Sequence, residues 1–270
     1  MSQHSLYFSK YHGTGNDFII IDEGGFPKEI YTPDVLRNLC CRHTGIGADG
    51  LILVKSIKDN EISMTYFNSD GYEGSMCGNG GRCAVAFALH KQMISHKAQI
   101  LVHAVDGIHK AEFIKTHPAE PEIKISIQNS KLPVCSVENT MFIDTGSPHI
   151  VVETTDTTLI DLLKEGKRLR NHSQLQPHGA NINFISTENG NLFVRTYERG
   201  VENETLSCGT GVTASAITWA FLQQKTGKQH VNVITKGGIL QVEFELKLDG
   251  VYHISLKGTA TYVFEGKISI

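Results

Sequence analysis

The strongest constraint on the fold is an internal repeat in the 270-residue chain. Three short motifs recur at nearly one spacing: TGNDFII at 14–20 with TGSPHIV at 145–151, GAD at 47–49 with GAN at 179–181, and CGNG at 77–80 with CGTG at 208–211. Cys208 follows Cys77 by 131 residues. Matches that recur at one offset indicate duplication of a structural unit, here of about 130 residues. We place the seam at residues 118–121, where two prolines interrupt the strand pattern.

Each half reads as strands around one buried helix. Segments rich in β-branched and aromatic residues, with partial alternation, dominate the chain and predict strands. Residues 83–89 and 212–222, which follow the two CG motifs, are apolar on nearly all sides. A helix without a polar face belongs in an interior. Further helices are predicted at 33–42, where Thr32 precedes Pro33, and at 156–169.

Charge and hydropathy exclude several classes of protein. Twenty-five Lys and Arg against 28 Asp and Glu give a formal charge of −3 without a basic block, so neither nucleic acid nor a membrane surface is an expected partner. No apolar stretch approaches the ~20 residues that span a bilayer. The first residues lack a secretory signal, so we expect a cytoplasmic protein. The six cysteines form no C-x-x-C pair and the histidines are scattered, which favours free thiols and no metal site.

The two CG motifs carry the clearest chemistry. Each places a cysteine and glycine-rich backbone at the start of a predicted helix, where free amides hold a carboxylate and favour a thiolate. A lone cysteine before an apolar helix is more often a buried structural thiol. The duplication changes this reading, because two such halves packed face to face would set Cys77 and Cys208 on opposite sides of one cleft. One thiolate would remove a proton from a carbon and the other thiol would return one to the opposite face, which inverts a stereocentre without a cofactor.

A second glycine motif does not indicate a nucleotide site. Residues 45–50 (GIGADG) match G-x-G-x-x-G, which needs a strand before it and a helix after it. Here a helix precedes and a strand follows, so a tight turn into a strand is the better interpretation.

Polar residues at predicted strand ends are candidates for substrate binding. Asn16, Asn68 and Asn181 take such positions, although an asparagine there can also bond its own backbone. Glu198 and Arg199 offer a partner for an ammonium group and a fork for a carboxylate, or form a solvated strand end. The place of His149 in the repeat suggests that it borders the same cleft.

Taken together, these residues match a known family. The matching motifs are GTGNDF at 13–18, GIGADG at 45–50, FNSDG at 67–71, MCGNGGR at 76–82, YERG at 197–200 and SCGTG at 207–211. Over nearly its whole length, the chain resembles the diaminopimelate epimerases, cofactor-independent enzymes of lysine and peptidoglycan synthesis.

The resemblance implies roles for individual residues. Cys77 and Cys208 would be the acid and base. The reacting carboxylate would lie against Gly78 with Asn79 and against Gly209 with Thr210. The remaining substrate-binding residues would be Asn16, Asn68, Asn181, Glu198 and Arg199, chiefly at the distal amino-acid end, with Ser147 as a weaker candidate and His149 in support.

The resemblance also implies the architecture. We expect an α+β fold of two pseudo-symmetric domains, each a mostly antiparallel, barrel-like sheet around a central helix. Residues 1–120 with 259–270 would form the N-terminal half and residues 121–258 the C-terminal half, with the active site in the cleft between them. Members of the family are often dimers, and Phe264 on the last strand is the expected contact.

The sequence departs from the family pattern in three places. Ser147 replaces a common asparagine, Gly50 replaces a glutamine found in some members, and the loop 201–207 is one residue longer than usual. Two alternatives stay open. The first is an epimerase of the proline racemase and hydroxyproline epimerase type, which usually carries histidine at the place of Asn79. The second is a thiol redox or metal-binding module.

Overall fold

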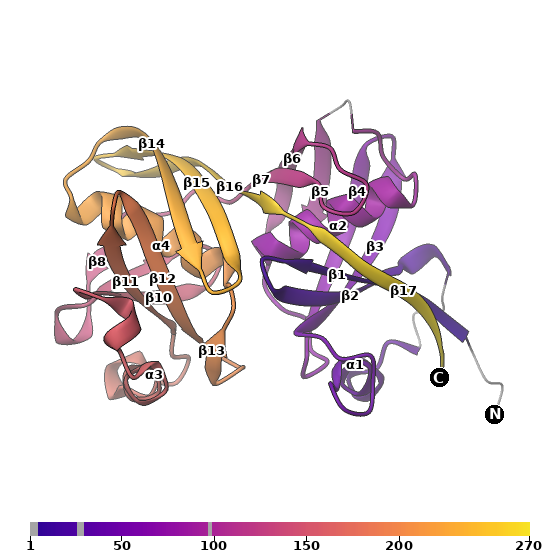
Figure 1. Ribbon diagram of the computed structural model, residues 1–270, viewed down its shortest axis with the longest axis horizontal. Helices are drawn as coiled ribbons and strands as arrows, with labels where there is room; N and C mark the ends of the chain where they lie inside the picture. The colour runs from indigo at the N-terminus through magenta and orange to yellow at the C-terminus, as the bar shows by residue number, and fades with distance from the viewer. Residues whose placement is uncertain (1–4, 26–29, 97–98) are drawn as a thin grey trace. The chain divides into compact units, whose positions relative to one another are not determined.

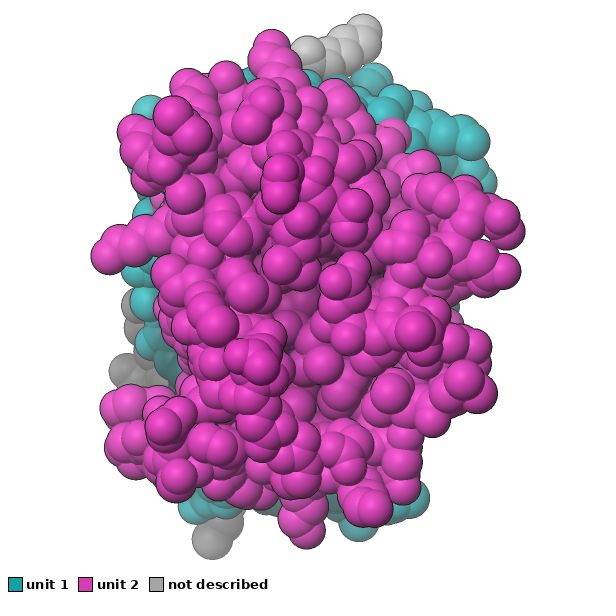
Figure 2. Space-filling view, turned by 90° about the vertical axis from the view of Figure 1, so that its left-hand side faces the viewer, with its two compact units in different colours: residues 1–125, 258–270 teal, residues 126–257 magenta. Residues whose placement is uncertain are grey.

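The computed structural model describes residues 5–25, 30–96 and 99–270. These residues divide into two compact units, coloured separately in Figure 2. Unit 1 comprises the chain up to Ile125 together with Gly258–Ile270, and unit 2 comprises Ser126–Lys257. The sequence placed the first boundary after residue 120, which is five residues earlier. The difference arises because residues 122–125 pair with the preceding strand of unit 1.

Unit 1 is a mixed sheet that wraps around one helix. Its strands are β1 (Ser5–Gly13), β2 (Asn16–Asp22), β3 (Gly50–Lys58), β4 (Glu61–Asn68), β5 (Ile100–Ala104), β6 (Gly107–Lys115), β7 (Glu122–Ser126) and β17 (Thr261–Ser269). They pair in the order β17–β1–β2–β3–β4–β5–β6–β7, with β2 parallel to β3, β4 parallel to β5 and the other pairs antiparallel. Helix α2 (Gly78–His90) packs against β1 to β5 and β17. In Figure 1 the yellow strand β17 lies beside the indigo strand β1.

Unit 2 repeats this arrangement. Its strands are β8 (Val134–Cys135), β9 (Met141–Asp144), β10 (Pro148–Glu153), β11 (Asn181–Glu188), β12 (Asn191–Glu198), β13 (Asn203–Thr205), β14 (Gly227–Thr235), β15 (Gly238–Lys247) and β16 (Gly250–Thr259). The order is β8–β9–β10–β11–β12–β14–β15–β16, with β10 parallel to β11 and β12 parallel to β14. Helix α4 (Gly209–Leu222) packs against β9 to β12, β14 and β15. Strand order and the places of the parallel pairs agree with the repeat in the sequence.

The repeated TG dipeptides form the turns that start the two matching strands. Gly15 at φ 85° and Gly146 at φ 100° have left-handed backbone, which favours glycine. Each turn leads into a strand. Strand β2 begins at Asn16, one residue after Gly15, and β10 begins at Pro148, two residues after Gly146. The repeat therefore fixes where the polar residues at these strand ends lie.

The peripheral helices are short. Helix α1 (Pro33–Cys40) begins with proline, and the Thr32 hydroxyl caps it by accepting from the amide of Val35. It ends two residues before the predicted end because Cys41 is extended. Residues 45–50 then turn into β3, with Gly47 at φ 80°, so the turn predicted in place of a nucleotide motif is confirmed.

One helix prediction is wrong at its start. The expected helix at 156–169 is a 3-10 turn η4 (Thr157–Leu159) followed by α3 (Leu162–Arg170). Ile160 is extended and breaks the helix, and the Asp161 carboxylate caps α3 by accepting from the amide of Lys164. Further 3-10 turns are η1 (Glu23–Gly25), η3 (Val137–Asn139) and η5 (Ser173–Leu175). None of the helices in the described ranges is long and apolar enough to cross a membrane.

Candidate active site

Cys77 is the residue that starts the central helix of unit 1. It has extended backbone (φ −110°, ψ 115°), and its sulfur accepts from the amide of Gly80 at 3.4 Å. A Cβ at residue 80 would lie 3.0 Å from Cδ1 of Ile52, so glycine lets the start of the helix pack closely against the core here. The sulfur therefore lies at the positive end of α2, where a thiolate and an anionic ligand are both stabilised.

One asparagine side chain contacts this sulfur, and a second asparagine side chain binds the first. The thiol of Cys77 donates to Oδ1 of Asn16 at 3.7 Å, and Nδ2 of Asn79 donates to the same oxygen at 3.3 Å. Asn79 is fully buried in the first turn of α2. The structure thus brings Asn16, Cys77, Gly78 and Asn79 together, as the sequence predicted for one side of the site.

A charged cluster supports Asn16 from behind. Nδ2 of Asn16 donates to Oδ2 of Asp49 at 2.8 Å, and Nη2 of Arg42 donates to Oδ1 of Asp49 at 2.6 Å. Arg42 also forks onto Asp17 at 2.8 and 3.0 Å, and Lys10 pairs with Asp17 at 2.8 Å. Burial raises the pKa of Asp49. Burial also acts to raise the pKa of Asp17, but hydrogen bonds from Arg42 and Lys10 outweigh it and lower that pKa to about 2.

Arg82 is a buried charge inside the same helix. Its side chain is fully buried, and it donates to Oδ1 of Asn79 at 3.0 Å, to the carbonyl of Gly78 at 3.3 Å and to the carbonyl of Thr259 at 3.4 Å. Burial lowers its pKa to about 10. The guanidinium thus stays charged at neutral pH and fixes the orientation of the Asn79 amide.

Cys208 starts the central helix of unit 2 in the same way. Its backbone is extended (φ −119°, ψ 112°), the residue is buried, and its sulfur lies 3.5 Å from Oγ1 of Thr210. Thr145 donates its hydroxyl to the carbonyl of Thr210 at 2.9 Å, which ties the turn before β10 to the start of α4. A Cβ at Gly211 would lie 2.5 Å from Oδ1 of Asn183 and 3.3 Å from the Cys208 sulfur, so glycine is required here too.

His149 is buried and neutral, and it is linked to the start of α4 through Asn183. Its Nδ1 accepts from Nδ2 of Asn183 at 3.1 Å, and Asn183 Oδ1 accepts from the hydroxyl of Thr196 at 2.9 Å. Burial, with a smaller contribution from the charge of Arg199, lowers the pKa of His149 to about 3. In the repeat, Phe18 of unit 1 takes the place of His149.

The other predicted residues of unit 2 gather at one edge of its sheet. Strands β10 and β11 run parallel and begin there, where His149 pairs with Asn181, and β12 runs antiparallel and ends there at Glu198. Oδ1 of Asn181 accepts from the backbone amide of Arg199 at 2.8 Å, and Nδ2 donates to the carbonyl of Pro148 at 3.4 Å. Ser147 lies in the turn just before β10.

Asn68 lies at the corresponding edge of the sheet in unit 1. It is the exposed last residue of β4 and pairs with Gly50, the first residue of β3. Gly50 itself has no room for a side chain, because a Cβ would lie 2.6 Å from the carbonyl of Phe67 and 2.9 Å from Oη of Tyr66. The Tyr66 ring fills the space that a larger residue at position 50 would need.

The sequence reasoning did not single out three residues of these networks: Asp49, Arg82 and Asn183. The available signals were an arginine within an otherwise apolar helix, an aspartate just before a buried strand and an asparagine inside another. All six cysteines are free. Across 5–25, 30–96 and 99–270, no group of three or more His, Cys, Asp or Glu could hold a metal ion.

Comparison with known proteins identifies the family. The family model described as diaminopimelate epimerase matches residues 8–125 and 141–263. The diaminopimelate epimerase of Flavobacterium psychrophilum is 43% identical over 266 residues, covering 96% of this chain and 98% of that relative. The chain belongs to the diaminopimelate epimerase family. The family member of Aquifex aeolicus is 39% identical and covers 98% of both chains.

The fold extends beyond diaminopimelate epimerases. A solved hydroxyproline epimerase from Agrobacterium vitis, with bound trans-4-hydroxy-L-proline, matches with a TM-score of 0.77 at 13% identity, covering all of this chain and 92% of that one. The match shows that the two share a fold. The three places where this sequence departs from the family pattern do not include either cysteine. The Gly50 position is filled by Tyr66, and the long loop after β12 contains β13, which pairs with β12.

Proposed function

We propose that the protein interconverts LL- and meso-diaminopimelate without a cofactor, as an isomerase of lysine and peptidoglycan precursor synthesis in the cytoplasm. The observation that carries the proposal is the duplicated cysteine at a helix start. Cys77 and Cys208 each precede a buried helix that is held by glycine against its sheet. The names of the relatives, which are diaminopimelate epimerases at 39–43% identity, point to this substrate.

In the proposed reaction, both sulfurs act on one α-carbon. One thiolate takes the α-proton, and the electron pair of the broken C–H bond spreads into the carboxylate. The amides at the helix starts, with Asn79 and Thr210, hold this carboxylate and stabilise the added charge. The opposite thiol then donates its proton to the other face of the carbon. The enzyme ends with thiol and thiolate exchanged, so the reverse reaction runs by the same steps.

The remaining polar residues would bind the distal end of the substrate. Diaminopimelate carries a second amino-acid group, which needs a partner for an ammonium and one for a carboxylate. We assign these to Glu198 and to the guanidinium of Arg199, with Asn181 holding the backbone of Arg199 in place. Asn16 and Asn68 complete the contacts from unit 1, Ser147 takes the place of the usual asparagine, and His149 supports the site as a neutral ring.

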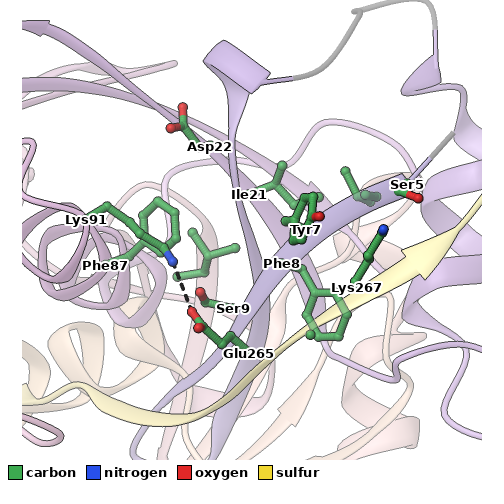
Figure 3. Close-up of a pocket in the computed structure, with 13 residues that line it drawn as sticks. Ser5, Tyr7, Phe8, Ser9, Ile21, Asp22, Phe87, Lys91, Glu265 and Lys267 are labelled. Atoms are coloured by element: carbon green, nitrogen blue, oxygen red, sulfur yellow. Dashed lines mark hydrogen bonds and ion pairs between the residues drawn. The ribbon is translucent and has the colours of Figure 1, made fainter.

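We further propose that the protein is a homodimer formed through the last strand. Phe264 on β17 is 44% exposed although its ring packs edge-on against Phe8 at 5.9 Å. A pocket of about 700 Å³ lies beside β17, lined by β1, β2, the end of α2 and β17 itself (Figure 3). Figure 3 shows Lys91 and Glu265 at this pocket, joined by an ion pair. Nζ of Lys91 lies 3.0 Å from Oε2 of Glu265. An exposed aromatic strand beside a hollow of this size is the kind of surface that a second copy covers.

The test is hydrogen exchange at the α-carbon. Reduced protein is incubated with LL-diaminopimelate in heavy water, and the α-proton is followed by NMR with Cys77→Ala and Cys208→Ala in parallel. We expect the α-proton signal to disappear and the meso isomer to form with the wild-type protein, and epimerisation to be lost in both variants. A wild-type protein that exchanges nothing would refute the substrate. Exchange of proline or hydroxyproline instead would support the alternative reading, which shares the fold.

A further inference from the structure

The hydrogen bonds around Cys77 run in one direction, from a cation to an anion. Arg82 donates to Oδ1 of Asn79 at 3.0 Å, Nδ2 of Asn79 donates to Oδ1 of Asn16 at 3.3 Å, and Nδ2 of Asn16 donates to Asp49 at 2.8 Å. A guanidinium only donates and a carboxylate only accepts. Both amides in between therefore have a single orientation that satisfies the whole chain.

This orientation decides which atom of Asn16 faces the sulfur. Oδ1 of Asn16 lies 3.7 Å from Sγ of Cys77 and accepts from its thiol proton. A thiolate has no proton to donate and would meet the partial negative charge of that oxygen. The contact therefore favours the protonated form of Cys77, and it depends on Asp49, which holds the amide nitrogen of Asn16 on the other side at 2.8 Å.

Asp49 is itself held firmly on the side away from the sulfur. Arg42 donates to Oδ1 of Asp49 at 2.6 Å, and the backbone amide of Asp17 donates to Oδ2 at 3.3 Å. Arg82 and Cys83 on α2 act electrostatically on the Cys77 thiol, and the charged cluster behind Asn16 consists of Asp49, Asp17, Arg42 and Lys10.

The second half of the repeat lacks this carboxylate. Asn181 takes the place of Asp49, and its side chain binds the backbone of Pro148 and Arg199 instead of a neighbouring amide. The directed chain is thus a property of the half that carries Cys77.

We propose that Asp49 is a positioning residue for Cys77, which acts by turning the Asn16 carbonyl oxygen toward the thiol and so keeps Cys77 protonated in the substrate-free protein. This rests on the proposed function for its catalytic meaning: Cys77 would then be the thiol that first delivers a proton. The geometry itself concerns unit 1 alone and can be tested without turnover.

The test is the pH dependence of Cys77 alkylation by iodoacetamide in the Cys208→Ala background. Cys41 is partly accessible and Cys135 is exposed, so the Cys77 peptide is followed by mass spectrometry, with the Cys135 peptide as internal reference. In Asp49→Asn, the new side chain would turn its oxygen to Arg42 and its nitrogen to Nδ2 of Asn16, which sets two donors against each other. We expect the alkylation midpoint of Cys77 to fall by about one pH unit.

A double-mutant cycle separates positioning from simple loss of charge. Asn16→Ala should lower the midpoint in the same direction, and Asp49→Asn added to it should lower it no further. Equal shifts from Asp49→Asn with and without Asn16 would show a through-space charge effect and overturn the proposal. Asp34→Asn, an exposed carboxylate on α1 paired with Arg37, is the control and should leave the midpoint unchanged.

The outcomes distinguish this proposal from the proposed function. If diaminopimelate is not epimerised but the midpoints behave as expected, the substrate is wrong and the role of Asp49 stands. If turnover is present and the midpoints do not move, the role of Asp49 is refuted alone. Should Asp49→Asn fail to fold, Asn16→Ala decides, because an unchanged midpoint in that variant also refutes the proposal.

Discussion

Nδ1 of His149 accepts a hydrogen bond from Nδ2 of Asn183 over 3.1 Å, so the ring proton is on Nε2. The direction is fixed because the same Nδ2 donates to the carbonyl of Ile150 at 3.1 Å, which leaves Oδ1 of Asn183 to accept from Thr196. The histidine is fully buried, and burial lowers its pKa to about 3, so the ring is neutral at neutral pH.

A neutral buried histidine makes stability depend on acid. The unfolded chain binds a proton on this ring near pH 6.5, whereas the folded protein does not until about pH 3, so stability falls as pH drops through this window. We expect a loss of roughly 1.4 kcal/mol per pH unit between about pH 6 and pH 4 from this group. Urea denaturation of the wild type and His149→Gln across this range measures it. The exposed His253→Gln is the control, and parallel profiles for wild type and His149→Gln would contradict the prediction.

Asp17 should also lose its contribution to stability in acid, but at lower pH than His149. Its folded pKa of about 2 lies below the ordinary pKa of an aspartate in an unfolded chain, so its contribution is complete above about pH 4 and disappears as pH falls toward 2. Asp17→Asn should lower the free energy of unfolding by about 2 kcal/mol at neutral pH, with a smaller difference near pH 3. The exposed Asp34→Asn should cost little. A difference that stays constant from pH 7 to pH 3 would show that Asp17 acts through packing rather than charge.

Arg199 should decide whether a two-headed substrate is recognised. Removing a charged hydrogen-bond partner of the distal carboxylate should lower kcat/KM for diaminopimelate by roughly 100-fold in Arg199→Ala. Arg199→Lys should recover only part of this, because lysine lacks the planar fork. Arg168→Ala, on α3 and paired with Glu138, serves as the control with unchanged kinetics. Wild-type activity in Arg199→Ala would remove the assignment of the distal group to this residue.

Phe264 should control the oligomeric state. A carboxylate on this strand would be buried without a partner if a second copy covers β17, so Phe264→Asp should shift the protein from dimer to monomer. Sedimentation equilibrium measures the mass. Leu248→Asp is a matched control, because Leu248 is 95% exposed in the turn between β15 and β16. A monomeric wild type, or a Phe264→Asp variant that remains dimeric, would refute this interface.

The repeat in the sequence predicted much of the local structure. Equal spacing of the TG and CG motifs corresponds to equal strand order and to two cysteines at helix starts. Apolar residues on all sides identified α2 and α4 as central helices. These features are local in sequence or depend on burial alone, which a pattern of residue types records directly.

The remainder depended on contacts between distant residues. Arg82 reads as part of a glycine motif, yet it is fully buried because carbonyls and Asn79 surround its guanidinium. Leu159 has helical spacing with Leu162 and Leu163, but it is exposed and lies outside α3, because Ile160 breaks the helix. Asp49 lies beside Asn16 because β2 and β3 pair in parallel, and no local sequence pattern predicts this pairing.

The pairing of β17 with β1 has a consequence for synthesis of the chain. The ribosome makes β1 before any residue of unit 2, and it makes the partner strand β17 only after all of unit 2. All of Ser126–Lys257 emerges between them, so the second unit has its complete sequence before the first one does. Unit 1 is therefore the last of the two units to close, and a ribosome that stalls before β17 is made leaves β1 paired on one side only, with β2.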